Sequence, residues 1–284
     1  SGLIYQGLFV DAPLTVSKLI GWWDFNDTSN MYTDGGSTNV SSDEDLLYRI
    51  NNKAASNVGD NALGLYLEQS TETNRPKFYT GGTNSKNYVK FDGSDNFIKG
   101  TEWGTDIGVV NSDEFSSSTV SLSAHTVFFV FETPSSALYT TTGSSTHQAP
   151  FSMWGSTTKN ISFRSQAPGE QRFNITGGGS GNLDTNTNLT TGTQYWTALI
   201  NGTSGSSSEI YKNGDNSTNY DGDGQSGSLN PQGLTIGADS DNQILSQQRF
   251  FNGDIYEILF YNKTLNSNEL STIETYLNNK YDIS

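Results

Sequence analysis

The chain has no cysteine and only two histidines among its 284 residues. Without thiols it can form no disulfide, no thiolate metal site and no cysteine nucleophile. His125 opens an apolar run and is expected at the edge of a strand, whereas His147 lies in a polar loop with no partner nearby in sequence. Nothing resembles a nucleophile elbow. These absences favour a protein without catalytic machinery.

Basic residues are also scarce, because 15 Lys and Arg face 30 Asp and Glu, which gives a formal net charge of −15. A nucleic-acid binder needs cations to neutralise phosphates, so we expect no nucleic-acid partner, and anionic membrane surfaces are disfavoured for the same reason. The charge should keep the protein soluble at high copy number. No apolar run approaches the roughly 20 residues of a transmembrane helix, and the first residues show no signal-peptide pattern. We therefore expect no membrane insertion.

Turn-forming and aromatic residues are abundant. The chain contains 30 Gly, 5 Trp, 14 Tyr and 15 Phe, but only 6 Pro. Many short strands joined by turns require such glycines, and large aromatic side chains bury the most area per residue. All-β chains of this length commonly form one domain, and no linker divides the sequence.

Strand patterns recur along the whole chain. Thr126–Phe131 is a continuous apolar run of strand length, which predicts a central strand covered on both faces. Tyr88–Asp92 alternates, and the Asn213-Gly214 pair after a strand predicts a tight reversal at positive φ. The other predicted strands are Leu19–Phe25, Asn96–Ile98, Phe151–Trp154, Asn160–Arg164, Arg172–Ile175, Tyr195–Ile200, Glu209–Tyr211, Leu234–Ile236 and Gly253–Tyr261.

Only the last twenty residues strongly indicate a helix. Asn266 can cap its start, and Glu269 three positions later completes a capping box. Leu270, Ile273 and Leu277 then form one apolar stripe at helical spacing, which must dock on the sheets because so short a helix is unstable alone. A weaker helical turn is predicted over Asp43–Ile50.

The order of the segments resembles the laminin-G-like, or concanavalin-A-like, jelly roll of bacterial surface proteins and phage structural proteins. The segments Trp22–Asp27, Val89–Ile98, His125–Phe131, Ile210–Gly214 and Leu234–Gly237 follow its order, and Phe251–Asn262 running into Leu265–Tyr281 resembles its last strand and trailing helix. The resemblance implies an all-β, antiparallel two-sheet jelly-roll sandwich with a short C-terminal helix. We assign residues 18–284 to this domain and residues 1–17 to an N-terminal arm.

The scaffold implies no activity by itself. Glucanase relatives place catalytic carboxylates on one strand in an E-x-D-x-(x)-E pattern, and alginate-lyase relatives need an R-x-E-x-R strand. The sequence contains neither pattern, and its close acidic residues lie in polar loops. A non-enzymatic protein is therefore the first hypothesis, and a carbohydrate-active enzyme or secreted lectin is the alternative.

A structural calcium ion is the one cofactor that the resemblance suggests. Relatives often bind it with a carboxylate directly before the residue matched by Glu257, and here Tyr256 occupies that position. Tyrosine does not supply the carboxylate oxygen that calcium prefers. Asp24, Asp92, Asp95 and Asp254 are the candidates for a different site, although Asp92 and Asp95 also fit an Asx turn.

Two further sets of side chains have a candidate role. Trp103 is flanked by loop residues and is the best candidate for an exposed glycan platform, whereas Trp22, Trp23 and Trp196 lie in strand patterns and are expected in the core. Glu257, in an apolar strand, is expected to support the strand–helix junction through hydrogen bonds or a salt bridge. The apolar residues of the arm are candidates for adding an edge strand to a partner; they are Leu3, Ile4, Tyr5, Leu8 and Phe9.

These observations favour a structural or adhesion module on a virion surface or in the extracellular space. Its partners would be other virion or surface subunits, including copies of itself, and host-surface glycans. Capsid decoration and a tail or fibre role are equally compatible with the sequence.

Overall fold

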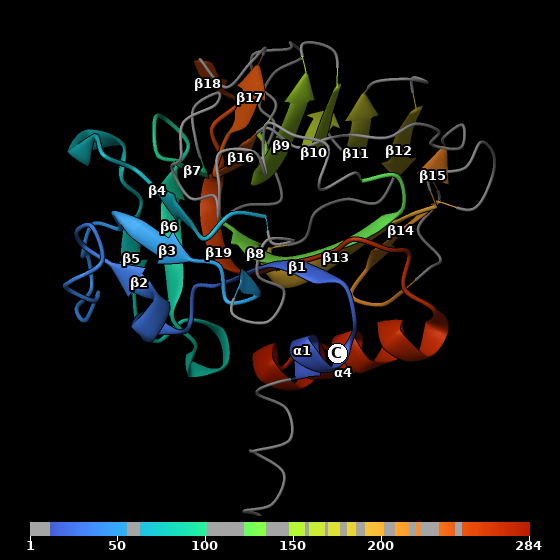
Figure 1. The fold of residues 1–284 in the computed structure, drawn as a ribbon, viewed down its shortest axis with the longest axis horizontal. Coiled ribbons are helices and arrows are strands. Elements are labelled where there is room, and N and C mark those ends of the chain that lie inside the picture. The colour runs from blue at the N-terminus through green and yellow to red at the C-terminus, as the bar shows by residue number, and fades with distance from the viewer. Residues whose placement is uncertain are drawn as a thin grey trace, which may run out of the picture.

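The computed structural model describes residues 12–55, 63–100, 122–134, 148–156, 159–167, 170–176, 181–185, 191–201, 208–215, 220–221, 233–241 and 246–284. It confirms the predicted all-β architecture, with two antiparallel sheets packed face to face and a C-terminal helix below them (Figure 1). None of the helices in these segments is long and apolar enough to cross a bilayer.

The first sheet has seven strands in the order β14-β13-β8-β19-β6-β5, and β1 pairs with the C-terminal half of β19. The central position of the predicted apolar strand is confirmed, because β8 lies between β13 and β19 and all but one of its residues are buried. The strands are β1 (Leu19–Asp24), β5 (Lys77–Tyr79), β6 (Tyr88–Asp92), β8 (His125–Thr133), β13 (Gly192–Ile200), β14 (Glu209–Lys212) and β19 (Asn252–Tyr261).

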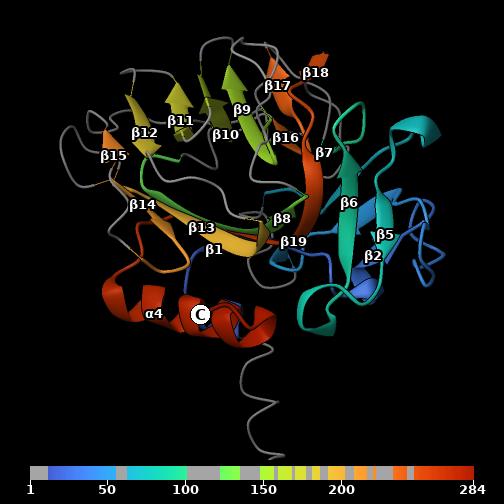
Figure 2. The ribbon, with the colours of Figure 1, turned by 180° about the vertical axis from the view of Figure 1, so that it is seen from behind.

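The second sheet has ten strands in the order β15-β12-β11-β10-β9-β16-β7-β4-β3-β2, and a separate pair, β17 (Asp239–Asp241) and β18 (Ser246–Gln248), lies beside it (Figure 2). Its strands are β2 (Met31–Tyr32), β3 (Arg49–Asn51), β4 (Tyr66–Glu68), β7 (Ile98–Gly100), β9 (Phe151–Ser156), β10 (Lys159–Ala167), β11 (Glu170–Thr176), β12 (Gly181–Thr185), β15 (Tyr220–Asp221) and β16 (Gly233–Ile236). Short 3-10 turns occupy Thr28–Asn30, Glu72–Asn74 and Thr83–Ser85.

An aromatic core fills the space between the sheets. Phe129 packs on Phe163 with ring centroids 4.4 Å apart, and Phe163 packs on Trp196 at 5.5 Å. Trp23 and Trp196 are fully buried in this core, whereas Trp22 is buried on the other face of the first sheet. The predicted core role of these tryptophans is confirmed.

A second apolar core lies on the outer face of the seven-stranded sheet, where α4 (Ser267–Tyr281) and α1 (Ala12–Thr15) pack side by side (Figure 1). The predicted capping box is present, because Asn266 accepts hydrogen bonds from the backbone of Asn268 and Glu269 and the Glu269 side chain accepts one from the Asn266 amide. Ile273 and Leu277 are fully buried. The helix and its docking stripe are thus confirmed.

One expectation differs from the structure. Asp43–Ile50 forms no helical turn, because Asp45 accepts hydrogen bonds from the Ser41 and Ser42 amides and the Leu47 amide donates to the Pro76 carbonyl instead. Residues 12–17, assigned to the arm, include α1, whose Ala12 is buried against α4. The domain boundary at residue 18 stays a prediction.

Candidate functional site

Several of the predicted site residues lie outside the described part of the chain. They are the glycan candidate Trp103 and the arm residues Leu3, Ile4, Tyr5, Leu8 and Phe9. Their roles stay predictions.

The four aspartates predicted as calcium ligands have different local environments, and among the described residues Asp254 Oδ1 is buried without a hydrogen-bond donor. Asp24 forms ion pairs with Lys53 and Lys280. Asp92 Oδ1 accepts from the amides of three following residues, Asp95 among them, which confirms the Asx turn. Among the residues that the structure describes, no group of three or more His, Asp or Glu side chains is arranged to hold a metal ion. The calcium site stays a prediction.

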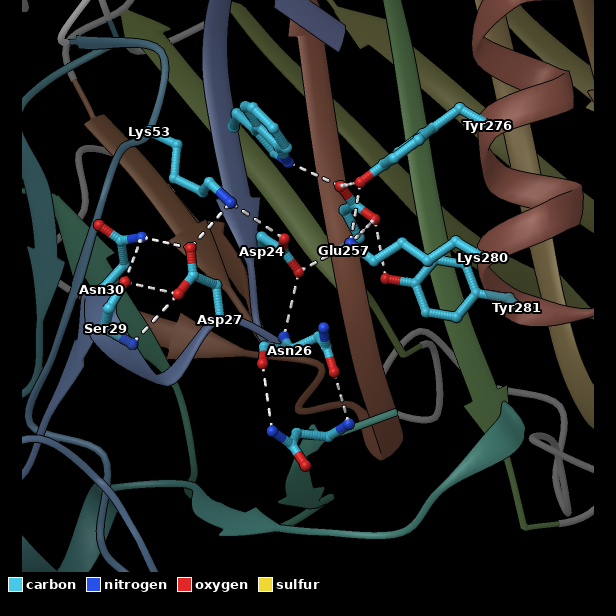
Figure 3. A network of polar contacts seen from close by, with 12 residues as sticks. Asp24, Asn26, Asp27, Ser29, Asn30, Lys53, Glu257, Tyr276, Lys280 and Tyr281 are labelled. Carbon is cyan, nitrogen blue, oxygen red and sulfur yellow. Dashed lines mark hydrogen bonds and ion pairs between the residues drawn. The ribbon is translucent and has the colours of Figure 1, made fainter. Parts of the chain in front are cut away.

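Glu257 is the centre of a buried polar network between the first sheet and α4 (Figure 3). Its Oε1 accepts hydrogen bonds from Trp22 Nε1 at 2.6 Å and from the Tyr276 hydroxyl at 2.8 Å. Its Oε2 accepts from Lys280 Nζ and from the Tyr281 hydroxyl, both at 2.8 Å. The side chain is fully buried and each oxygen already has two donors, so Glu257 is a structural support, as the sequence predicted.

Lys280 extends the network to Asp24, whose carboxylate lies 2.9 Å from Lys280 Nζ and 3.2 Å from Lys53 Nζ. Burial opposes ionisation of Asp24, but the two ammonium groups outweigh it and lower its pKa. Burial likewise opposes the charge on Lys280, and Asp24 and Glu257 outweigh it and raise its pKa. Asp24 and Lys280 are therefore charged at neutral pH, and their ion pairs join β1, β19 and α4.

A row of charged side chains crosses the outer face of the first sheet beside this network. The strand register places Lys77 of β5 opposite Lys90 of β6, and Lys90 opposite Asp254 of β19. Asp254 lies opposite Glu132 of β8. Residues directly opposite in an antiparallel pair project from the same face with Cβ atoms about 5 Å apart, so four charges follow one line across four strands.

A row of tyrosines lies next to these charges. Tyr79 and Tyr88 are opposite each other on β5 and β6, and their rings stack with centroids 5.5 Å apart and an interplanar angle of 13°. Tyr88 in turn contacts the Tyr256 ring at 5.5 Å. Tyr256 is buried, whereas Tyr79 and Tyr88 are half-buried. The row therefore runs from the interior to an open aromatic surface.

The two rows meet at a surface groove of about 580 Å³, hereafter the outer-face groove. Tyr79 supplies an aromatic wall, and the long cationic side chains of Lys77, Lys90 and Arg75 supply hydrogen-bond donors. The lining consists of Leu46, Glu72, Thr73, Arg75, Lys77, Tyr79, Lys90, Asp92 and Asn96.

Glu132 and Asp254 form a pair of neighbouring carboxyl groups at the edge of this region. Glu132 Oε2 accepts hydrogen bonds from the hydroxyls of Thr193 and Tyr256, both at 3.1 Å, and more weakly from Thr83. Burial raises the pKa of Asp254 to about 6, assisted by Glu132 and opposed by Lys90. One carboxyl group is thus hydrogen-bonded and the other is close to titrating at neutral pH.

We expect Asp254→Asn to stabilise the protein at pH 7 by roughly 1–2 kcal/mol, a value reduced for partial exposure of the carboxylate. Because its folded-state pKa is raised, the folded state binds more protons between about pH 4 and 6, so stability falls as pH rises through that window. The gain should therefore vanish near pH 4. Urea unfolding at both pH values measures it, with the exposed Asp95→Asn as control. An equal gain at both pH values would contradict this account.

A second pocket, of about 520 Å³, adjoins the buried network, because Trp22 and Lys53 line it together with Asn51, Leu65 and Tyr66. The Arg49 guanidinium covers the Tyr66 ring at 3.8 Å. The lining of this pocket, hereafter the comparison pocket, contains one half-buried tyrosine and one lysine.

Sequence reasoning did not identify Lys77, Tyr79, Tyr88, Lys90 or Glu132 as site residues. The alternation of Lys77-Phe78-Tyr79 and of Tyr88–Asp92 was the available signal, since it separates an inner apolar set from an outer polar and aromatic set. His125 is the first residue of β8, as expected, and burial lowers its pKa to about 3, which keeps the imidazole neutral.

Comparison with solved structures finds jelly-roll domains of carbohydrate-active proteins. Domain 4 of AbnA, an extracellular GH43 arabinanase from Geobacillus stearothermophilus solved with arabinotriose, is 14% identical over 93% of this chain and 98% of its own, with a TM-score of 0.48. The CBM40 of a Ruminococcus gnavus IT-sialidase, bound to α2,3-sialyllactose, is 12% identical over 66% of this chain and 95% of its own, with a TM-score of 0.43.

The NanB sialidase of Streptococcus pneumoniae is 17% identical over 54% of this chain, with a TM-score of 0.39, and the match spans only 24% of the sialidase. At such identities the likeness concerns the fold alone. No curated protein matches this sequence.

A family model matches residues 111–271, which is more than half of the chain. The matched segment includes β8 and β19 but begins after β5 and β6, so the tyrosine pair and the two lysines lie outside it. The match agrees with the two packed antiparallel sheets and with the order of the last strand and helix. The chain belongs to the concanavalin A-like lectin/glucanases superfamily.

Proposed function

We propose that this chain is a non-catalytic carbohydrate-binding module that holds a sugar chain in the outer-face groove. The observation that carries the proposal is the stacked pair Tyr79–Tyr88, half-buried beside a groove lined with charged donors. One face of a sugar ring carries mainly C–H groups and packs on an aromatic ring, while its hydroxyls need polar partners at the rim. The groove offers both.

The groove is also partly pre-organised, which favours binding because little order must be imposed on association. Arg75 donates from Nε to the Gln69 carbonyl and from Nη2 to the Ser70 carbonyl, each at 2.9 Å. Its guanidinium also lies 4.8 Å from the centroid of the Tyr48 ring. Tyr79 is held against Tyr88, so both the aromatic wall and one cation have fixed orientations.

A glycoside hydrolase is the second candidate, and the Glu132–Asp254 pair is the observation that favours it. Retaining glycosidases use two carboxyl groups about 5 Å apart, one of them with a raised pKa. Against this, Glu132 Oε2 already accepts three hydroxyl donors, and neither carboxyl group lines the outer-face groove. We therefore favour binding without cleavage.

A panel of soluble plant, bacterial and animal polysaccharides separates these candidates, with binding measured by affinity electrophoresis and products by chromatography. Binding without release of fragments supports the module. Fragment release that is lost in both Asp254→Asn and Glu132→Gln would establish the hydrolase instead. Failure to bind any polymer would contradict both.

We further propose that the module is displayed on a virion or in the extracellular space, where it contacts neighbouring subunits, other copies of itself and host-surface glycans. The net charge of −15 supports display at high copy number, because a net charge far from zero keeps a protein soluble. An antibody against the folded chain should label intact particles or cells by electron microscopy. Labelling that appears only after lysis would contradict this location.

A further inference from the structure

The cross-strand pair Lys77–Lys90 has an electrostatic cost that the fold does not explain. The two residues are directly opposite on β5 and β6 and project from the outer face, while Phe78 and Val89 fill the core behind them. Like charges opposite each other destabilise a sheet. Neutral polar side chains at these two positions would cover the same face without charge repulsion. We therefore look for a function of the two lysines.

Nearby acidic groups compensate for this pair only in part. Lys77 Nζ lies 3.3 Å from Glu44, but the two side chains are 46% and 64% exposed, and such pairs contribute little. In the part of the chain that the structure describes, Lys90 forms no ion pair within 4 Å, although Asp254 lies directly opposite it on β19 and the charge on Lys90 opposes the rise in the pKa of Asp254. The Asp92 carboxylate lines the groove, yet its Oδ1 is occupied by three backbone amides of its own turn.

The lining of the groove carries more cations than carboxylates, against the trend of a chain with a net charge of −15. Arg75, Lys77 and Lys90 line it together with two acidic residues, Glu72 and Asp92. At physiological salt the Debye length is about 8 Å, so a ligand in the groove interacts mainly with these neighbours and less with distant acidic loops.

We propose that the sugar chain bound in the outer-face groove is anionic, with its carboxylate or sulfate groups held by Lys77 and Lys90 while Tyr79 packs on a sugar ring. The inference rests on the proposed carbohydrate-binding function and names its ligand class. An anion between the two ammonium groups removes their mutual repulsion, so binding relieves a strain that the free protein carries. Charge-assisted contacts of this kind are stronger than neutral hydrogen bonds.

The test compares polymers that differ only in charge. Polygalacturonate and its fully methyl-esterified form test carboxylates, and dextran sulfate and dextran test sulfate esters. Biolayer interferometry at about 20 and 300 mM salt should show at least about tenfold tighter binding of one charged polymer than of its neutral partner, and the difference should shrink at high salt. Preference for polygalacturonate over its ester identifies the bound group as a carboxylate, and preference for dextran sulfate over dextran identifies it as a sulfate ester.

The variant Lys77→Gln/Lys90→Gln should lose about tenfold in affinity for the charged polymer and keep its affinity for the neutral one. Lys18→Gln, an exposed lysine outside the groove, is the matched control and should change neither. The double variant should unfold at the same temperature or a higher one, because it removes the repulsion.

Equal binding of charged and neutral polymers, or a charge preference that survives in the double variant, would overturn this inference and leave the carbohydrate-binding function intact. Absence of binding to every polymer would overturn both.

Discussion

Replacing Lys280 with methionine is expected to lower the free energy of unfolding by about 3–5 kcal/mol, because removing one partner of a buried ion pair leaves uncompensated charge in the interior. Lys280 contacts the carboxylates of Asp24 and Glu257, whose side chains are 5% and 0% exposed. Methionine keeps the length of the side chain but supplies no donor, so one substitution leaves two buried carboxylates without their shared cation. Urea denaturation at pH 7 measures the change.

The comparison variant is Lys263→Met, whose partner Glu269 is about a quarter exposed. Lys263→Met should lower the free energy of unfolding by no more than about 1 kcal/mol. Adding Glu257→Gln to Lys280→Met should recover part of the lost stability, since it removes one of the stranded charges. If Lys280→Met costs no more than Lys263→Met, the network is not a major source of stability.

Replacing Tyr79 with alanine is expected to weaken binding of the preferred polysaccharide by about 30-fold, equivalent to about 2 kcal/mol and typical of a central aromatic contact. The substitution removes the half-buried Tyr79 ring that lines the groove but leaves Tyr88 packed on Tyr256. Tyr79→Phe keeps the ring and should retain most of the affinity. Isothermal titration calorimetry with one defined oligosaccharide gives both values.

Tyr66→Ala is the matched control, because Tyr66 is also half-buried and lines the comparison pocket instead. The Tyr66→Ala variant should bind the oligosaccharide with the same affinity as the unaltered protein. Loss of binding in Tyr66→Ala with none in Tyr79→Ala would move the ligand to that pocket and remove the basis for the outer-face groove.

The features that sequence reasoning predicted correctly depend on local chemistry. The capping box at Asn266 and Glu269 requires only residues three positions apart, and the stripe of α4 requires one helical period. The turn at Asn213 and Gly214 has φ values of 52° and 76°, as this pair favours. A long apolar run such as β8 likewise predicts a buried strand from its composition alone.

The features that it missed depend on register between distant strands. Lys77, Lys90, Asp254 and Glu132 become one row only when β5, β6, β19 and β8 are aligned, and a shift of one residue would send each side chain to the other face. Nothing local fixes that alignment. The wrong helical turn at Asp43–Ile50 has the same origin, because a carbonyl at Pro76, far along the chain, binds the Leu47 amide.

The position of β1 and β19 has a consequence for biosynthesis. Trp22 and Glu257 are hydrogen-bonded across 235 positions of sequence, and among the described strands β1 pairs only with β19. Contacts between such distant residues form slowly, because the entropy cost of closing a large loop precedes the free energy gained from the contacts. During synthesis on the ribosome, Trp22 and Trp23 of β1 therefore stay exposed to solvent until β19 has been made. A chaperone that binds this segment in the meantime would raise the yield of folded protein.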